Sequence, residues 1–307
     1  MPKSTSSPPA VADCSPAREH AAVSLNPLSS AALLIEGWVR RRDDPAGPPS
    51  RVTRATGFLV DSAHAGHVLV TARHVLSGED MTTGHYTTKP EYLTVRLPPA
   101  PDGDPPPLLV ELYDDYPTET GRLWVEHPRG REVDVAAVPL PVPLPADATV
   151  VVLDHAPPPL TASAFWLPEN GPAPEPSSAV ALRVTDRLFV VGWPYGDTGS
   201  WPHAVWSTGY ISTEPDIDWN GLPAFLLDCR SRQGQSGAPV LLHLRPTDTV
   251  MLADGDTLHH GATVTRLVGV YSGRVDASSD LGRVFTTAAV RDVLAQLHPH
   301  ADSTTAP

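Results

Sequence analysis

The chain has few lysines, few cysteines and no long hydrophobic run, and each shortage excludes a class of protein. Of 22 basic residues only two are lysines, and the 35 acidic residues leave a net charge of −13. Nucleic-acid and membrane-surface binders carry a basic face, which such an acidic composition does not favour. We therefore expect neither a nucleic acid nor a membrane as a partner.

The two cysteines, Cys14 and Cys229, are too few for a disulfide framework. The longest apolar runs, such as residues 31–35, are far too short to cross a bilayer. Residues 1–16 are rich in Ser, Pro and Ala and lack the apolar core of a secretory signal. These absences predict a cytoplasmic protein, and the excess of Ala, Pro and Arg favours a bacterial one.

What the sequence does contain is a series of short β-type runs separated by Pro, Gly and Asp turns. Asn220-Gly221, between two apolar runs, predicts a two-residue hairpin. Residues 287–297 have one apolar stripe and predict a C-terminal helix. The pattern indicates an all-β fold of two packed six-stranded antiparallel β-barrels followed by that helix.

Composition divides the chain into five parts. We expect a disordered N-terminal arm, the first barrel, a Pro-rich linker, the second barrel with its helix, and a polar tail. Their boundaries are 1–29, 30–145, 146–180, 181–300 and 301–307.

Two motifs place an imidazole and a carboxylate at strands. In residues 69–75 (LVTARHV) a β-type run ends at a small residue and His74 follows directly, so the imidazole is held at the mouth of the strand. In residues 132–138 (EVDVAAV), Asp134 is a lone acid within an apolar strand. An ionised carboxylate there is costly unless another group binds it, and the ring N–H of a catalytic histidine would do so.

A third motif, residues 234–240 (GQSGAPV), places Ser236 between two glycines in a tight turn before a strand. Gly234 permits a backbone that points N–H groups into a pocket. The amides of Gly234 and Ser236 would then stabilise an oxyanion, by roughly 3–4 kcal/mol per donor. Each motif alone also has a non-catalytic interpretation. The histidine could simply be packed, the aspartate could protect a strand edge from aggregation, and the Gly-x-Ser-Gly segment could be an ordinary turn. Their order, His then Asp then Ser, favours catalysis.

Together these segments resemble the chymotrypsin/trypsin-like serine peptidases, particularly the bacterial trypsin-like members. Residues 71–74 are similar to the T-A-x-H element of that family, 133–136 to its D-[IV]-A strand, and 234–239 to G-[DN]-S-G-G-P. Further matches are residues 56–58 (TGF), 191–194 (VGWP) and 268–273 (VGVYSG).

The resemblance and the chemistry assign His74, Asp134 and Ser236 to a catalytic triad, and Gly234 and Ser236 to an oxyanion hole. No metal or other cofactor is implied. The Thr71 hydroxyl either supports Asp134 or belongs to an ordinary strand threonine.

The resemblance also implies a substrate pocket, with Arg230 at its base and the segment after the last substrate-pairing strand as a wall. The predicted substrate-binding residues are Arg230, Tyr271, Ser272, Gly273 and Arg274. An arginine in the pocket would favour an acidic side chain before the cleaved bond, the P1 position. Alternatively the arginines face solvent, Arg230 pairs with Asp228, or Tyr271 fills the pocket and restricts it to small side chains.

Position 235 departs from the family pattern. Secreted digestive members carry an aspartate there, which pairs with a new N-terminus after activation cleavage. The uncharged Gln235 cannot form that ion pair, so we do not expect the N-terminal arm to be an activation peptide of that kind. Cys229 is expected to be a small buried apolar residue rather than a nucleophile.

The sequence thus predicts a serine endopeptidase that cleaves protein or peptide substrates through an acyl-enzyme intermediate. With no export signal, it would be a regulated intracellular enzyme, with a regulatory protein partner and a role such as a stress or defence effector. The alternative is a protease-fold binding module, latent or inactive because the peptide at Gly234-Gln235 is flipped. An esterase is disfavoured because residues 234–240 lack a G-x-S-x-G strand-to-helix context.

Overall fold

The computed structural model describes residues 26–140, 151–152 and 181–297, apart from 43, 45, 63–64, 81–82, 99–104, 117–120, 197–202, 252–254, 256, 260–262 and 277. The predicted arm (1–29) lies outside the described residues except at 26–29, and the predicted linker (146–180) except at 151–152. The predicted tail (301–307) lies entirely outside them.

The N-terminal half is one eight-stranded sheet in the order β5-β4-β1-β2-β3-β7-β6, with β8 paired to β2. Its strands are β1 (Ala32–Val39), β2 (Ser50–Ser62), β3 (Gly66–Thr71), β4 (Tyr92–Arg96), β5 (Leu108–Glu111), β6 (Val125–Glu126), β7 (Ala136–Pro139) and β8 (Val151–Val152). Alternate side chains of these strands, among them Leu33, Ile35 and Leu93, fill a buried apolar cluster. Within the described residues this sheet does not close, whereas the sequence predicted a six-stranded barrel.

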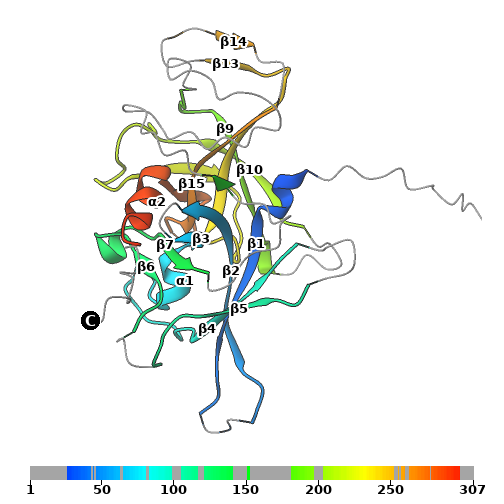
Figure 1. The fold of residues 1–307 in the computed structure, drawn as a ribbon. Coiled ribbons are helices and arrows are strands. Elements are labelled where there is room, and N and C mark those ends of the chain that lie inside the picture. Colours follow the sequence, from blue (N-terminus) through cyan, green and yellow to red (C-terminus); the bar gives the residue numbers. More distant parts are fainter. Residues whose placement is uncertain are drawn as a thin grey trace, which may run out of the picture.

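The C-terminal half is a closed barrel in the order β10-β11-β16-β15-β12-β9. Its strands are β9 (Arg187–Gly192), β10 (Val205–Ile211), β11 (Ala224–Cys229), β12 (Ala238–Leu244), β15 (Val264–Arg274) and β16 (Leu281–Thr286). The short pair β13 (Thr249–Met251) and β14 (Thr257–His259) extends from it at the top of Figure 1.

Helix α2 (Thr287–Leu294) follows β16 directly. It buries Val290, Val293 and Leu294 against strands of both halves, as the apolar stripe predicted. These residues belong to a core cluster that also contains Phe58 and Phe285, so apolar packing joins the two halves. The all-β class with a C-terminal helix is confirmed.

The predicted hairpin is confirmed at Asn220 and Gly221, whose φ angles of 54° and 69° are those of a type I′ turn. Three shorter helices complete the elements used below: η1 (Pro27–Ser30), α1 (Arg73–Ser77) and η2 (Gly130–Glu132). No helix in the described part of the chain is long and apolar enough to cross a membrane.

Candidate active site

His74 lies in the first turn of the short helix α1, directly after β3. Ala72, between the strand and the helix, has an extended backbone, and Gly78 ends the helix in the left-handed conformation. Val75 and Leu76 are buried and anchor the helix on the sheet. The imidazole, 30% exposed, is therefore presented by a packed element.

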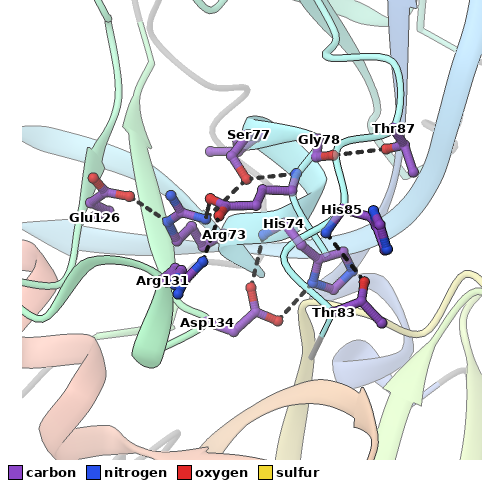
Figure 2. Close-up of polar contacts among 12 residues, drawn as sticks. Arg73, His74, Ser77, Gly78, Thr83, His85, Thr87, Glu126, Arg131 and Asp134 are labelled. Carbon is purple, nitrogen blue, oxygen red and sulfur yellow. Dashed lines mark hydrogen bonds and ion pairs between the residues drawn. The ribbon is translucent and has the colours of Figure 1, made fainter. Parts of the chain in front are cut away.

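Asp134 accepts hydrogen bonds from both the backbone and the ring of His74. Its Oδ1 lies 2.8 Å from the His74 amide nitrogen, and its Oδ2 lies 2.6 Å from His74 Nδ1 (Figure 2). The carboxylate is only 1% exposed, so these donors offset the cost of its burial. Because an ionised carboxylate only accepts, Nδ1 carries the proton and Nε2 is left free to receive one.

The local structure around Asp134 differs from the prediction. Asp134 does not lie within a strand: it follows η2 and precedes β7, which begins at Ala136. Val133 and Val135 on either side are fully buried, as the apolar pattern indicated. The irregular backbone brings the carboxylate to the end of β3 rather than to a face of the sheet.

A third donor to Asp134 comes from the other half of the molecule. The Ser272 hydroxyl, expected to bind substrate, lies 2.5 Å from Asp134 Oδ2. The Thr71 hydroxyl, one candidate for that role, instead donates to the Thr56 carbonyl at 2.8 Å. Ser272 therefore ties the C-terminal barrel to the acid of the N-terminal sheet.

The environment of His74 shifts its pKa upward. Burial of the ring lowers the pKa, but the charge of Asp134 and its hydrogen bond outweigh burial, so the pKa lies above the ordinary 6.5. The protonated imidazolium is thus stabilised at this position. A histidine whose charged form is stabilised in this way is suited to take up a proton during a reaction.

Arg73, the residue before His74, anchors the same helix through charge (Figure 2). Its Nε lies 2.5 Å from Glu126 Oε2 and its Nη1 lies 2.9 Å from Glu79 Oε2. Burial lowers the pKa of Arg73, but the bonds and charges of both carboxylates raise it overall. Its side chain is 12% exposed, so this ion-pair cluster is largely screened from water.

The turn that carries Ser236 packs against the segment leading to His74. Ser236 is half-buried, and its carbonyl accepts from the Thr56 amide at 2.9 Å. The next residue, Gly237, has φ +82°, and a Cβ there would lie 2.2 Å from Thr71 Oγ1 and 2.8 Å from the Ala72 nitrogen. Only glycine allows this approach, which brings the turn against the start of α1.

Neighbouring groups fix the peptides that precede Ser236. The Gln233 carbonyl accepts from the Tyr195 amide at 2.5 Å, and the Gln235 carbonyl accepts from the Ala238 amide at 3.0 Å. In a trans peptide the N–H points away from the C=O, so these bonds also orient the amides of Gly234 and Ser236. Neither amide has an acceptor among the described residues.

The amide and the hydroxyl of Thr56 both hold this loop. Besides its amide bond to Ser236, its hydroxyl donates to the Gly234 carbonyl at 2.8 Å and accepts from the Trp193 amide at 3.0 Å. Gly234 itself has φ +99°, and a Cβ there would lie 2.3 Å from the Trp193 carbonyl oxygen. The peptide between Gly234 and Gln235 is thus held from both sides, since the Gln235 amide also donates to the Arg232 carbonyl at 3.2 Å.

Gln235 is fully buried and satisfied by neutral partners. Its Oε1 accepts from the Arg232 amide at 2.7 Å, and its Nε2 donates to Ser207 Oγ at 2.9 Å. The side-chain amide therefore spans from the loop to β10. Neutral hydrogen bonds stand where the digestive enzymes are expected to have an ion pair.

Tyr271 fills the space between β15 and the loop before Ser236. It is 1% exposed, and its hydroxyl donates to Ser231 Oγ at 2.5 Å. A Cβ on Gly282 would lie 2.3 Å from the Tyr271 ring, so the ring occupies the room that this glycine leaves. Of the other residues predicted for the pocket, Arg230 and Arg274 are exposed, which is the solvent-facing alternative.

Two further predictions concern Gly273 and Cys229. Gly273 is half-buried beside Ser272 on the predicted wall. Cys229 is a free thiol, 1% exposed, and burial raises its pKa to about 11. The prediction that Cys229 is a buried apolar residue is thus confirmed. Among the residues that the structure describes, no three His, Cys, Asp or Glu side chains gather as a metal site.

Sequence reasoning missed Thr56, the partners of Arg73 and the role of the Ser272 hydroxyl. Thr56 lies in the T-G-F segment that the resemblance singled out, which was the available signal. The Ser272–Asp134 contact joins residues 138 positions apart and had no local signature.

Comparison with solved structures finds similar bacterial proteases. The inactive-form Ser343Ala mutant of Rv3671c from M. tuberculosis H37Rv is 16% identical, with 91% of this chain and 90% of that chain covered and a TM-score of 0.43. The active form of the M. tuberculosis Rv3671c protease is 16% identical, with 91% of this chain and 83% of that chain covered and a TM-score of 0.44. The serine endoprotease from Yersinia pestis is 14% identical, with 88% of this chain and 63% of that chain covered and a TM-score of 0.41.

A search of curated proteins found no match. The family model of the trypsin-like peptidase domain matches residues 55–244, a span that contains His74, Asp134 and Ser236 and more than half of the chain. This chain belongs to the trypsin-like peptidase domain family.

Proposed function

We propose that this protein is a serine endopeptidase with Ser236 as nucleophile, His74 as general base and Asp134 as the residue that orients the base. The observation that carries the proposal is the buried Asp134 carboxylate 2.6 Å from His74 Nδ1. This bond fixes the tautomer in which Nε2 can accept a proton. The family assignment supplies the substrate class, which is a peptide or protein.

In the proposed reaction the Ser236 Oγ attacks the carbonyl carbon of the scissile bond while His74 Nε2 takes the hydroxyl proton. The imidazolium gives that proton to the leaving amine, and the C–N bond breaks to leave an acyl-enzyme. Water then attacks the ester, again with His74 as base, and Ser236 regains its proton. Asp134 stays ionised and stabilises the imidazolium in both halves.

The amides of Gly234 and Ser236 are the proposed oxyanion donors. Both lack an acceptor among the described residues, and bonds to the neighbouring carbonyls hold both peptides. Donors placed before the reaction cost no reorganisation when the negative charge develops. This arrangement favours an active enzyme over a latent binding module.

We further propose that the pocket for the P1 side chain accepts only small residues. The Tyr271 ring and its bond to Ser231 occupy the gap between the loop and β15. The acidic P1 preference loses its basis, because Arg230 and Arg274 are exposed to solvent rather than buried in a pocket. Tyr271→Ala should open the pocket, so that peptides with Phe at P1 gain in kcat/KM relative to peptides with Ala.

The test of the proposed function is labelling of the purified protein with a small fluorophosphonate, followed by peptide mapping. We expect the label on Ser236 in the wild type and no label in Ser236→Ala. Ser77→Ala is the matched control, because Ser77 lies on α1 but its hydroxyl accepts from Arg73 Nη1 and the Glu79 amide rather than from His74. Failure of the folded wild type to react would contradict the enzyme and favour the binding module.

A further inference from the structure

A polar cavity of about 270 Å³ lies beside the oxyanion loop. It is lined by Gln233 and Gly234 of that loop, by Tyr195 and by residues 51–54 of β2. None of the residues around the Tyr271 ring lines this cavity. We call it the β2 groove. It shares Gly234 with the candidate active site.

A β-bulge sets the side chains of the β2 groove. Across the β1–β2 ladder Gly37 pairs with Thr53 but Trp38 pairs with Arg51, so Val52 has no partner. The extra residue shifts the alternation of β2, and Arg51 and Arg54 consequently lie on the same face. Both reach one oxygen of Glu36, at 2.9 Å from Arg51 Nη1 and 3.0 Å from Arg54 Nε.

The charges of the β2 groove do not cancel. Two guanidinium groups share a single carboxylate, Glu36, which leaves a net positive charge. Arg54 Nη1 donates to the Tyr195 carbonyl at 3.2 Å, but the Nη2 groups of both arginines have no acceptor among the described residues. Arg51 and Arg54 are 38% and 32% exposed, so these donors face an accessible space. A protein with net charge −13 thus keeps a basic groove next to its proposed nucleophile.

The backbone beside the groove also has a sheet edge on which no strand pairs within the described part of the chain. Residues 50–57 of β2 pair with β1 on one side, whereas β3 pairs with β2 only from Phe58 onward. The Thr56 amide points to the open side, because it donates to the Ser236 carbonyl. Strand alternation places the N–H and C=O of Arg54 on that side too. An extended peptide leaving the active site can therefore pair with this edge.

We propose that the β2 groove binds acidic side chains in the part of the substrate that follows the scissile bond. The inference rests on the proposed function, which places the acyl half of the substrate at Tyr271 and its carbonyl oxygen at Gly234. The chain beyond that carbonyl then enters the groove that Gly234 shares. Carboxylates there would accept from Arg51 and Arg54, since planar guanidinium groups match them well. The specificity of this enzyme would lie after the cleaved bond.

The experiment compares three peptides with one acyl half, ending in Ala, and with Glu-Glu, Gln-Gln or Lys-Lys after the cleavage point. We expect kcat/KM to fall in the order Glu, Gln, Lys, and the spread to shrink as salt screens the charges. Arg51→Gln and Arg54→Gln should each reduce the Glu-to-Gln ratio about three- to ten-fold, the effect of one exposed charge-assisted hydrogen bond. Glu36→Gln should raise the ratio, because both arginines lose their competing carboxylate.

Arg96→Gln is the matched control, since Arg96 is an exposed arginine on β4, two strands away from β2. It should leave the ratio unchanged. The rate of fluorophosphonate labelling, a reaction that involves no leaving peptide, is measured for each variant beside its Glu-to-Gln ratio. Normal labelling with equal cleavage of the Glu and Gln peptides would overturn the groove and leave the proposed function intact. Absence of labelling would instead overturn the proposed function. Binding of the Glu peptide to Ser236→Ala, measured by fluorescence anisotropy, would then test the groove alone.

Discussion

The two halves of the molecule hold their parts of the candidate site by different forces. In the N-terminal sheet charge positions His74: Asp134 accepts from its ring, and Arg73 joins the same helix to Glu126 and Glu79. In the C-terminal barrel neutral groups position the Ser236 turn, through the buried amide of Gln235 and the hydroxyl of Thr56 from β2.

This difference separates the pH-sensitive part of the site from the insensitive part. Ion pairs respond to protonation and salt, whereas amide and hydroxyl bonds do not. The Ser236 turn is therefore formed without an ion pair that activation cleavage would have to create. Conversely, charged carboxylates hold His74 and its helix.

Removing the charge of Asp134 should have the largest effect on the charged half. Asp134→Asn keeps the size of the side chain but favours the wrong histidine tautomer, so we expect kcat to fall about 10³–10⁴-fold. The charge of Asp134 raises the pKa of His74, so its loss should move the acid limb of any remaining activity to lower pH. The wild-type limb should lie above pH 6.5, since activity requires neutral His74. A pH profile of kcat/KM measures both, and an unshifted limb in the variant would contradict the pair.

Removing a hydrogen bond from the neutral half should reduce activity less than Asp134→Asn does, and the loss should appear in kcat. Thr56→Val is nearly isosteric but leaves the Gly234 carbonyl and the Trp193 amide without their hydroxyl partner. If this bond holds an oxyanion donor in place, we expect kcat to fall about 10²-fold with KM nearly constant. Thr94→Val is the control, because the Thr94 hydroxyl also has a hydrogen-bond partner, Trp38 Nε1, but lies on β4. Equal kcat values in the two variants would show that the Thr56 hydroxyl does not hold an oxyanion donor in place.

The smallest predicted effect concerns stability at two pH values. Burial raises the pKa of Glu126, but Arg122 and Arg73 lower it below the ordinary 4.5. The stability that ionised Glu126 gives the folded protein is therefore complete above about pH 4.5, and it is lost as the pH falls through the lowered pKa of Glu126. Arg73→Met should cost about 2–4 kcal/mol at pH 7 and less at pH 3.5.

Gln235→Met provides the comparison, because it should cost about 1–3 kcal/mol at both pH values. Urea unfolding of each variant against the wild type gives these differences. A penalty for Arg73→Met that did not change with pH would show that the charged cluster does not anchor α1 in the way described.

The sequence was most informative where function depends on local motifs. The strand end before His74 and the glycines around Ser236 have direct signatures, and the structure places both segments together through Gly237. Gln235 also indicated the missing ion pair before its partners were known. The predicted cytoplasmic setting and regulatory partner stay predictions.

Contacts between distant segments could not be predicted. The acid lies in irregular chain rather than in a strand, and Ser272 rather than Thr71 supports it, because the packing of the two halves decides both. Arg230 follows the family position of a pocket base yet is exposed. The Tyr271 ring lies between β15 and the loop before Ser236, and it fits only because residue 282 is glycine.

The most direct test of the central claim is cleavage of one peptide by the wild type and by Ser236→Ala, with Ala at P1 and Glu-Glu after the cleavage point. The account predicts a single cut after Ala by the wild type, and a loss of kcat of at least about 10³-fold in the variant. Cleavage by Ser236→Ala at the wild-type rate, or a wild type that cuts no peptide at all, would contradict it.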